Sequence, residues 1–128
     1  MTKIVGCSLI IKDDFNNILV LKKKVKRGQK EEWSILNQKI RAKEATVKCI
    51  NRGVKDILKS IIFDLETFGQ YIVDEENQEE IAVFIGSLKE KVTLDKNYKE
   101  CKWINKNDLD KHEFAELDKK IIEDYFNR

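Results

Sequence analysis

The chain has 128 residues, of which 41% are hydrophobic and 38% are charged. A chain of this length forms one domain and buries roughly two-thirds of the surface that its unfolded form exposes. The composition excludes a disordered tail, a collagen-like chain and a membrane protein, since no apolar run approaches the ~20 residues that span a bilayer. We therefore expect a single domain over residues 1–128, with no signal peptide.

Charge and cysteine usage exclude further classes. The 25 basic and 23 acidic residues give a net charge of +2, which is too balanced to indicate a nucleic-acid or membrane surface. Cys7, Cys49 and Cys101 lack C-x-x-C spacing, and His112 is the only histidine. This pattern argues against disulfides, a Cys/His metal site and Ser-His-Asp catalysis. We expect a cytoplasmic protein, and the Lys-, Ile- and Asn-rich composition suggests a bacterial source.

Apolar patterning predicts strands and helices in a defined order. In chain order these are strands over 4–11 and 18–25, a short strand at 33–36, a helix over 44–61, strands over 67–73, 81–88 and 101–104, and a helix from 114 onwards. The first two strands are expected to form a hairpin, because a cluster of Asp and Asn at 13–17 separates them. This order predicts an α+β fold in which a mixed β-sheet is covered by helices.

Three local features qualify this pattern. Gly53 lies in the middle of the first helix, where it costs about 1 kcal/mol relative to alanine and therefore needs an explanation. The acidic run at 74–80 is interpreted as a solvated hairpin tip. Asp110 followed by Glu113 is interpreted as a capping pair for the last helix.

A motif around the first helix resembles the box of the Nudix hydrolase family, G-x5-E-x7-R-E-U-x-E-E-x-G-U, where U is a bulky aliphatic residue. Trp33 matches the tryptophan that precedes the box, Glu44 its leading glutamate and Arg52 its arginine. Val54 takes the aliphatic position, and Asp56 conservatively replaces the first glutamate of the final pair. The spacing is kept without a gap, and the resemblance spans nearly the whole chain. It implies a Nudix-like mixed sheet sandwiched between helices.

The remaining box positions depart from the family pattern. Residues 36–38 (LNQ) stand where Pro-Gly-Gly is usual, and Gly53 and Ile57 replace two glutamates. In the family, the box holds Mg²⁺, which polarises a pyrophosphate oxygen while a water is activated. Positions 53, 56 and 57 share one helical face, and Asp56 is the one carboxylate left there. The resemblance therefore implies that Mg²⁺ would be held loosely, through the phosphates of a nucleotide.

The resemblance implies that Asp56, Glu44 and Arg52 form the catalytic set, with Asp56 as the metal ligand. Two simpler interpretations of these residues stay open. Glu44 and Arg52 can form a salt bridge that only holds the loop against the helix. Alternatively, Glu44, Lys48, Arg52 and Asp56 can form an ordinary surface ladder of charges spaced four residues apart.

Three residues are expected to contact a nucleotide-like ligand: Trp33, Arg27 and Gln38. Trp33 can stack on a base, and Arg27 belongs to a basic stretch over 22–30 that can contact a phosphate. The alternatives are that Trp33 is a core residue and that the basic stretch is a solvated loop.

Three functions stay open. The first is a Nudix-fold protein with weak or no pyrophosphohydrolase activity that binds a nucleotide-like ligand or a partner. The second is a Mg²⁺-dependent hydrolase of nucleoside-diphosphate-linked compounds that combines Asp56 with carboxylates outside the box, drawn from Glu32, Glu66, Glu79 and Glu100. The third is a small α+β protein-interaction module. The amphipathic C-terminal helix would allow a homodimer.

Overall fold

The computed structural model describes residues 2–128. In chain order its elements are β1 (Lys3–Ile11), β2 (Ile18–Lys23), β3 (Trp33–Ser34), β4 (Leu36–Lys39), α1 (Thr46–Leu58), β5 (Ile62–Asp74), β6 (Glu79–Leu88), β7 (Tyr98–Ile104), the 3₁₀ helix η1 (Lys106–Lys111) and α2 (Glu116–Phe126). The predicted α+β class is confirmed. The predicted elements occur in the expected order, but the short strand expected at 33–36 is two strands, β3 and β4, and η1 was not expected. Within the described residues, neither α-helix has the length and apolar composition needed to cross a membrane.

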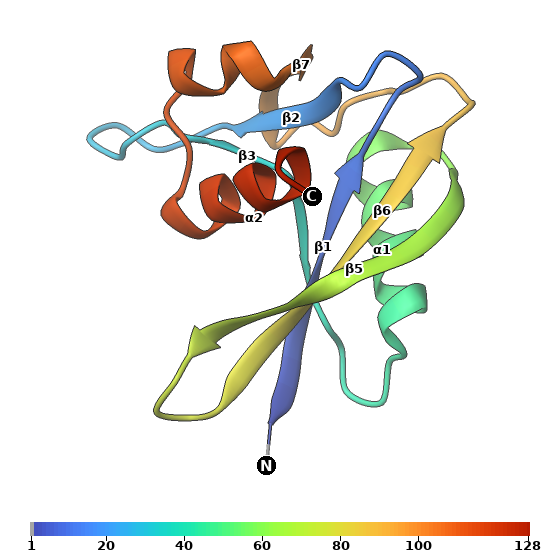
Figure 1. The fold of residues 1–128 in the computed structure, drawn as a ribbon, viewed down its shortest axis with the longest axis vertical. Coiled ribbons are helices and arrows are strands. Elements are labelled where there is room, and N and C mark those ends of the chain that lie inside the picture. Colours follow the sequence, from blue (N-terminus) through green and yellow to red (C-terminus); the bar gives the residue numbers. More distant parts are fainter. Residues whose placement is uncertain (1) are drawn as a thin grey trace.

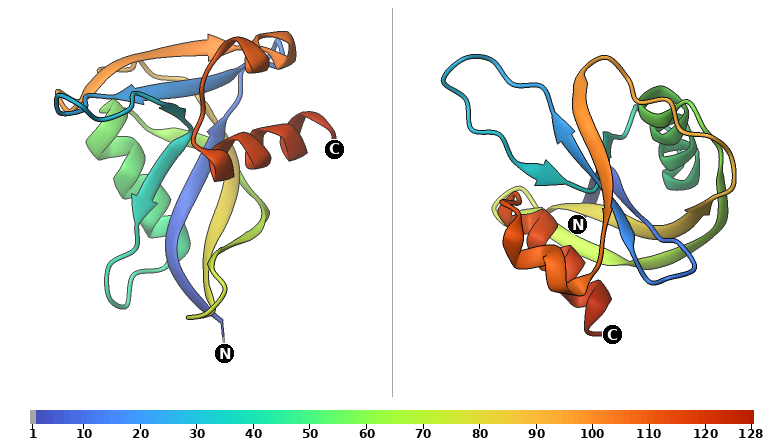
Figure 2. Two further views of the ribbon diagram at one scale, coloured as in Figure 1. Left: turned by 90° about the vertical axis from the view of Figure 1, so that its left-hand side faces the viewer. Right: turned by 90° about the horizontal axis from the view of Figure 1, so that it is seen from above.

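The strands form two sheets (Figure 1). The larger sheet has the order β4-β1-β6-β5, in which β1 and β6 run parallel and the other pairs are antiparallel. The smaller sheet has the order β3-β2-β7 and is antiparallel. Figure 2 shows α1 and α2 on opposite sides of the larger sheet. The predicted mixed sheet between helices is therefore present.

The predicted hairpin of the first two strands is wrong. β1 pairs with β4 and β6, whereas β2 pairs with β3 and β7 in the other sheet. One isolated bridge, between Lys12 and Ile18, links the two strands at the turn. The reason is that residues 6–11 are buried continuously, so β1 is a central strand with both faces covered. A short turn between two apolar runs does not determine which strands pair.

Two apolar clusters lie on the two faces of the larger sheet. Alternation along β1 divides its side chains, so that Cys7, Leu9 and Ile11 face α1 while Ile10 faces α2. The cluster on the α1 side also contains Leu19, Leu21, Leu36, Cys49, Ile50, Val54, Ile57, Leu58, Ile62, Ala82 and Phe84. The cluster on the α2 side also contains Ile18, Val20, Trp33, Ile35, Val83, Ile85, Ile104, Leu109, Phe114, Ile121, Ile122 and Tyr125.

The predicted capping pair at the last helix is also wrong. Asp110 lies inside η1, and Glu113 forms an ion pair with Lys30 at 3.0 Å. The capping box belongs to η1, where the side chains of Asn105 and Asp108 each accept a hydrogen bond from the other's backbone N–H. The capping box therefore lies before η1 and not before α2.

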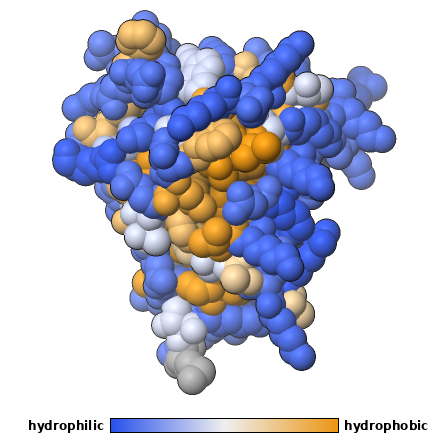
Figure 3. Space-filling view, turned by 90° about the vertical axis from the view of Figure 1, so that its right-hand side faces the viewer, coloured by the Kyte–Doolittle hydropathy of each residue, from blue (hydrophilic) through white to orange (hydrophobic). Residues whose placement is uncertain are grey.

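Most of the surface is polar, with scattered apolar side chains. Figure 3 shows one face, which is largely hydrophilic around an apolar area near its middle. The most exposed large apolar side chains in the described chain include Phe15, Ile61 and Ile72. Single exposed apolar residues of this kind are ordinary in folded proteins.

Candidate functional site

Arg52, in the middle of α1, and Glu44, in the loop before α1, form a forked ion pair. Arg52 Nε donates to Glu44 Oε2 and Arg52 Nη2 donates to Glu44 Oε1, both at 2.9 Å. Arg52 Nη2 also donates to the carbonyl oxygen of Lys39 at 2.7 Å, and the backbone N–H of Arg41 donates to Glu44 Oε1 at 3.0 Å. These hydrogen bonds, first of all those from Arg52, lower the pKa of Glu44 from its ordinary 4.5 to about 2. The pair therefore fastens the loop after β4 to α1.

Gly53 does not interrupt α1, which runs continuously from Thr46 to Leu58. The helix instead approaches β4 closely at this position. A Cβ atom on Gly53 would lie 3.1 Å from Leu36 Cδ2 and 3.3 Å from Gln38 Cβ. Glycine thus clears space for the helix to pack on the sheet. The glutamate that the family pattern has here would not fit without displacing these neighbours.

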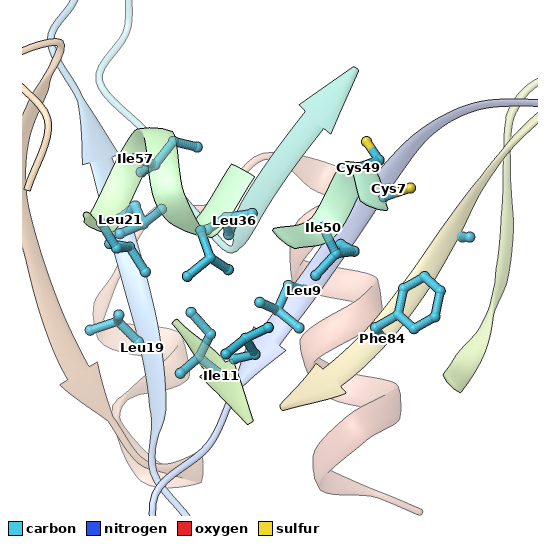
Figure 4. Close-up of a cluster of buried hydrophobic side chains, with 14 residues drawn as sticks. Cys7, Leu9, Ile11, Leu19, Leu21, Leu36, Cys49, Ile50, Ile57 and Phe84 are labelled. Carbon is cyan, nitrogen blue, oxygen red and sulfur yellow. The ribbon is translucent and has the colours of Figure 1, made fainter. Parts of the chain in front are cut away.

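Ile57 belongs to the core rather than to an open pocket. Its side chain is 6% exposed and lies in the same cluster as Leu21 and Leu36 (Figure 4). A carboxylate at this position would be buried among apolar side chains, which strongly disfavours its charged form. At two of the three carboxylate positions of the box, 53 and 57, α1 therefore packs closely against other parts of the protein, which leaves no room for a carboxylate.

Asp56 lies on the exposed side of α1, next to two shallow hollows. One hollow, of about 590 Å³, is also lined by Glu44 and Arg52, so the structure brings the three predicted catalytic residues to one place. The other, of about 820 Å³, is lined by Asp56, Ser60 and Glu90, among others. Glu90 follows β6 in a polar loop, and nothing in the sequence marks it. Residues 2–128 contain no group of three His, Cys, Asp or Glu side chains that could hold a metal ion.

A larger groove, of about 870 Å³, shares no lining residue with these two hollows. It is lined by Val5, Gly6, Cys7, Ser8, Lys23, Asn37, Gln38, Lys39, Val73, Glu79, Ile81, Tyr98, Leu117 and Asp118. These residues come from β1, β4, β5 and β6 of the larger sheet, from the ends of β2 and β7, and from the first turn of α2. A groove of this size is within the range of small-molecule sites.

Asp118 is the most buried charged side chain that lines this groove, with 7% of its surface exposed. Its Oδ2 atom accepts hydrogen bonds from the backbone N–H of Ile35 at 3.1 Å and from Asn37 Nδ2 at 2.9 Å. The Ser8 hydroxyl donates in turn to Asn37 Oδ1. Burial raises the pKa of Asp118, although both hydrogen bonds oppose this shift. Both donors bind Oδ2, so the second carboxylate oxygen, Oδ1, keeps acceptor capacity.

Asp118 is a site residue that the sequence prediction missed, although the sequence contains a signal for it. Asp118, Ile121, Ile122 and Tyr125 are spaced i, i+3, i+4 and i+7, and all four are buried. A carboxylate within an apolar helical stripe indicates a buried acid that needs partners.

The three residues expected to contact a ligand lie in three different environments. Gln38 lines the groove. Trp33 is 6% exposed and packs in the core on the α2 side, with the amines of Lys22 and Lys102 at 5.1 and 4.8 Å from its ring centre. Arg27 is exposed in the loop between β2 and β3 and lines neither the groove nor the two hollows. The structure therefore places only Gln38 at the groove.

No protein-family model matches the sequence, and no curated protein sequence matches it. Solved structures do match the fold over nearly the whole chain. A MutT protein studied from Aliivibrio salmonicida and Vibrio cholerae superposes with a TM-score of 0.80 at 14% identity, covering 95% of this chain and 96% of that chain. A Nudix hydrolase from Nitrosomonas europaea superposes with a TM-score of 0.77 at 15% identity, covering 99% of this chain and 90% of that chain. The chain has the Nudix fold.

A third matching structure was determined with a bound ligand. The Nudix domain of Shewanella oneidensis NrtR, determined in complex with ADP-ribose, superposes with a TM-score of 0.73 at 12% identity and covers 100% of this chain and 88% of that chain. The resemblance to Nudix hydrolases expected from the sequence is thus confirmed at the level of the fold. Identities of this size leave the activity to be argued from the residues present.

Proposed function

We propose that this Nudix-fold protein binds a nucleotide-like ligand and has weak or no pyrophosphohydrolase activity. The observation that carries the proposal is the packing of Gly53 and Ile57 against Leu36 and its neighbours. Asp56 is the one carboxylate left at the three box positions, so the residues present do not fit a Mg²⁺ site of the family's kind. The proposal treats residues 1–128 as a single domain of a cytoplasmic, bacterial protein.

The groove beside Asp118 supports the binding part of the proposal. Lys23 and Lys39 offer cations for phosphate oxygens, and the Gln38 amide offers both a donor and an acceptor. Asp118 Oδ1 offers an acceptor for an N–H group. A nucleotide carries phosphate oxygens at one end and base N–H groups at the other. It therefore matches this set of side chains better than a purely apolar or purely anionic molecule does.

One observation favours a second candidate function, which is Mg²⁺-dependent hydrolysis of nucleoside-diphosphate-linked compounds. Asp56 and Glu90 line the same hollow. Two carboxylates, together with the phosphates of a substrate, are the oxygen ligands that Mg²⁺ prefers. Of the outside carboxylates considered from the sequence, Glu79 lines the groove and not this hollow.

Thermal unfolding and a turnover assay together test the two candidates. ADP-ribose, nucleoside triphosphates and sugar nucleotides are added in EDTA or in Mg²⁺, and products are followed by chromatography. A ligand at 100 times its Kd adds about 2.7 kcal/mol to the free energy of unfolding, which raises the Tm by several degrees. We expect this rise in EDTA as well as in Mg²⁺, with no turnover.

Two variants make the test specific. Asp118→Asn keeps the shape of the side chain but turns the free acceptor into a donor, so we expect it to lose the rise in Tm. Asp110→Asn, on the exposed side of η1, is the matched control and should keep it. Turnover in Mg²⁺ that Asp56→Asn abolishes would establish the hydrolase instead. If no nucleotide raises the Tm, the protein is better explained as a partner-binding module.

A further inference from the structure

Two cysteine thiols that neither candidate function uses meet inside the fold. Cys7 lies on β1 and Cys49 on α1, and Figure 4 shows their side chains next to each other. Both thiols are free, and each lies within hydrogen-bonding reach of the other. They are far apart in the sequence, so only the packing of α1 on β1 brings them together.

The other contacts of these two thiols are weak. Cys7 Sγ donates to the carbonyl oxygen of Thr46 at 3.5 Å. Cys49 Sγ lies 3.7 Å from the carbonyl oxygen of Gln38 and 3.6 Å from that of Lys39. Because a thiol is a weak hydrogen-bond donor, the two sulfur atoms lose little when they turn from these carbonyl groups toward each other.

Cys49 is the thiol of the pair that ionises more readily. Burial raises the pKa of both thiols, and it raises that of Cys7 to about 12. At Cys49 two neighbours oppose this increase in pKa, namely the hydrogen bond with Cys7 and the Arg52 guanidinium. Arg52 Nη2 lies 3.9 Å from Cys49 Sγ, where its positive charge favours the thiolate. Cys49 is therefore the better nucleophile of the two.

Two hollows reach the surroundings of this pair. The smaller one, of about 290 Å³, is lined by Thr46 and by Ala82, which is the partner of Cys7 on β6. The larger one is the groove beside Asp118, and Cys7 is one of its lining residues. Hydrogen peroxide is little larger than water and can approach from either hollow. Bulkier thiol reagents are kept out, because both side chains are buried.

We propose that Cys7 and Cys49 form an intramolecular disulfide when the native protein meets a peroxide. The Cys49 thiolate attacks one oxygen of the peroxide, the O–O bond breaks, and Cys49 becomes a sulfenic acid while hydroxide leaves. The Cys7 sulfur then attacks the Cys49 sulfur, so that the S–S bond forms, the S–O bond breaks and a second hydroxide leaves.

The reaction is balanced by the two thiols and one peroxide. The thiols lose two electrons and two protons, and the protons convert both hydroxides to water. A dithiol reductant reverses the step by thiol–disulfide exchange. The inference goes beyond the proposed function, because it concerns a modification of the protein and holds whether or not a nucleotide binds.

Peptide mapping of native protein treated with hydrogen peroxide tests this inference. Remaining thiols are blocked with N-ethylmaleimide as the protein is unfolded, so that no disulfide forms afterwards. Cys101→Ser is the matched control, because it keeps the pair and removes the partly buried thiol that would otherwise join two molecules. Cys49→Ala, made in the Cys101→Ser protein, removes one partner of the pair.

We expect the peptides that contain Cys7 and Cys49 to be joined in the wild type and in Cys101→Ser, and dithiothreitol to separate them. The disulfide should raise the Tm by at least about 5 °C over the reduced form, a rise that the Cys49→Ala protein cannot show. The inference is overturned if the native protein acquires no such link, if the link forms only when peroxide is added in urea, or if the linked protein has the lower Tm.

Discussion

Gly53 of α1 lies so close to Leu36 of β4 that a Cβ atom on the glycine would come within 3.1 Å of Leu36 Cδ2. Leu36 is 1% exposed and cannot move aside freely. The close approach explains why a residue that is unfavourable in helices stands in the middle of one.

Gly53→Ala should therefore fail to stabilise the protein, although alanine is about 1 kcal/mol better than glycine in a helix. Gly53→Glu should lower the free energy of unfolding by about 1–3 kcal/mol, because the larger side chain overpacks the contact with Leu36 and Gln38. Urea denaturation measures both changes. Asn51→Ala, at an exposed position of the same helix, is the control and should stabilise slightly. A gain of about 1 kcal/mol for Gly53→Ala would show that the contact is not tight.

The Glu44–Arg52 pair should make the free energy of unfolding depend on pH in the acidic range. Arg52 lowers the pKa of Glu44 in the folded protein to about 2, below its ordinary value of 4.5. This stabilisation is fully present above pH 4.5 and is lost as the pH falls from there toward 2. Glu44→Gln should flatten this part of the profile of unfolding free energy against pH. Glu76→Gln, at the exposed turn between β5 and β6, should leave the profile as in the wild type.

Asp118 should show the opposite dependence on pH. Burial raises its pKa in the folded protein, so the folded state binds the proton more tightly than the unfolded state does. The contribution of Asp118 to stability therefore increases as the pH falls through its folded pKa. Asp118→Asn should remove this increase and be at least as stable as the wild type near neutral pH.

Asp118→Ala should behave differently from Asp118→Asn. It leaves the backbone N–H of Ile35 and the Asn37 amide without their acceptor, which should cost about 1–3 kcal/mol. Chemical denaturation at several pH values distinguishes the two substitutions. Equal losses in both would mean that the negative charge, rather than the hydrogen-bond acceptor, is what the fold requires.

The three free thiols should differ in reactivity. Cys7 is buried, and burial raises its pKa to about 12, so its reactive thiolate is rare at pH 8. Cys101 is only partly buried and should react first with a thiol reagent in the native protein. Labelling followed by peptide mass spectrometry should find Cys101 modified and Cys7 protected until denaturant is added. Early modification of Cys7 would indicate local opening between β1 and α1.

The elements that the sequence predicted well are those with a clean period. The helix around Ile50 and Val54 shows regular apolar spacing, and the turn at 75–78 follows from its acidic and amide residues. The start of β5 was missed, and the structure shows why. Its pairing with β6 is irregular between Phe63 and Glu66, and Asp64 has a φ of +56°. Such bulges break the two-residue alternation on which strand prediction depends.

The candidate site was predictable only where residues are close in sequence. The spacing of Glu44 and Arg52 within one loop and helix predicted their ion pair. Asp118 contacts Ile35 and Asn37 across more than 80 residues, and Glu90 lines the same hollow as Asp56 from another part of the chain. Contacts of this kind depend on the sheet topology. The sequence prediction paired β1 with β2 and therefore gave the wrong topology.

The central position of β1 has a consequence for how the chain folds during synthesis. Its parallel partner, β6, ends at Leu88, so neither apolar cluster can close until most of the chain has left the ribosome. A nascent chain that stops before β6 would carry β1, with its continuous apolar run, unpaired on one edge. Truncated forms of this protein should therefore aggregate or be captured by chaperones rather than persist as smaller folded units.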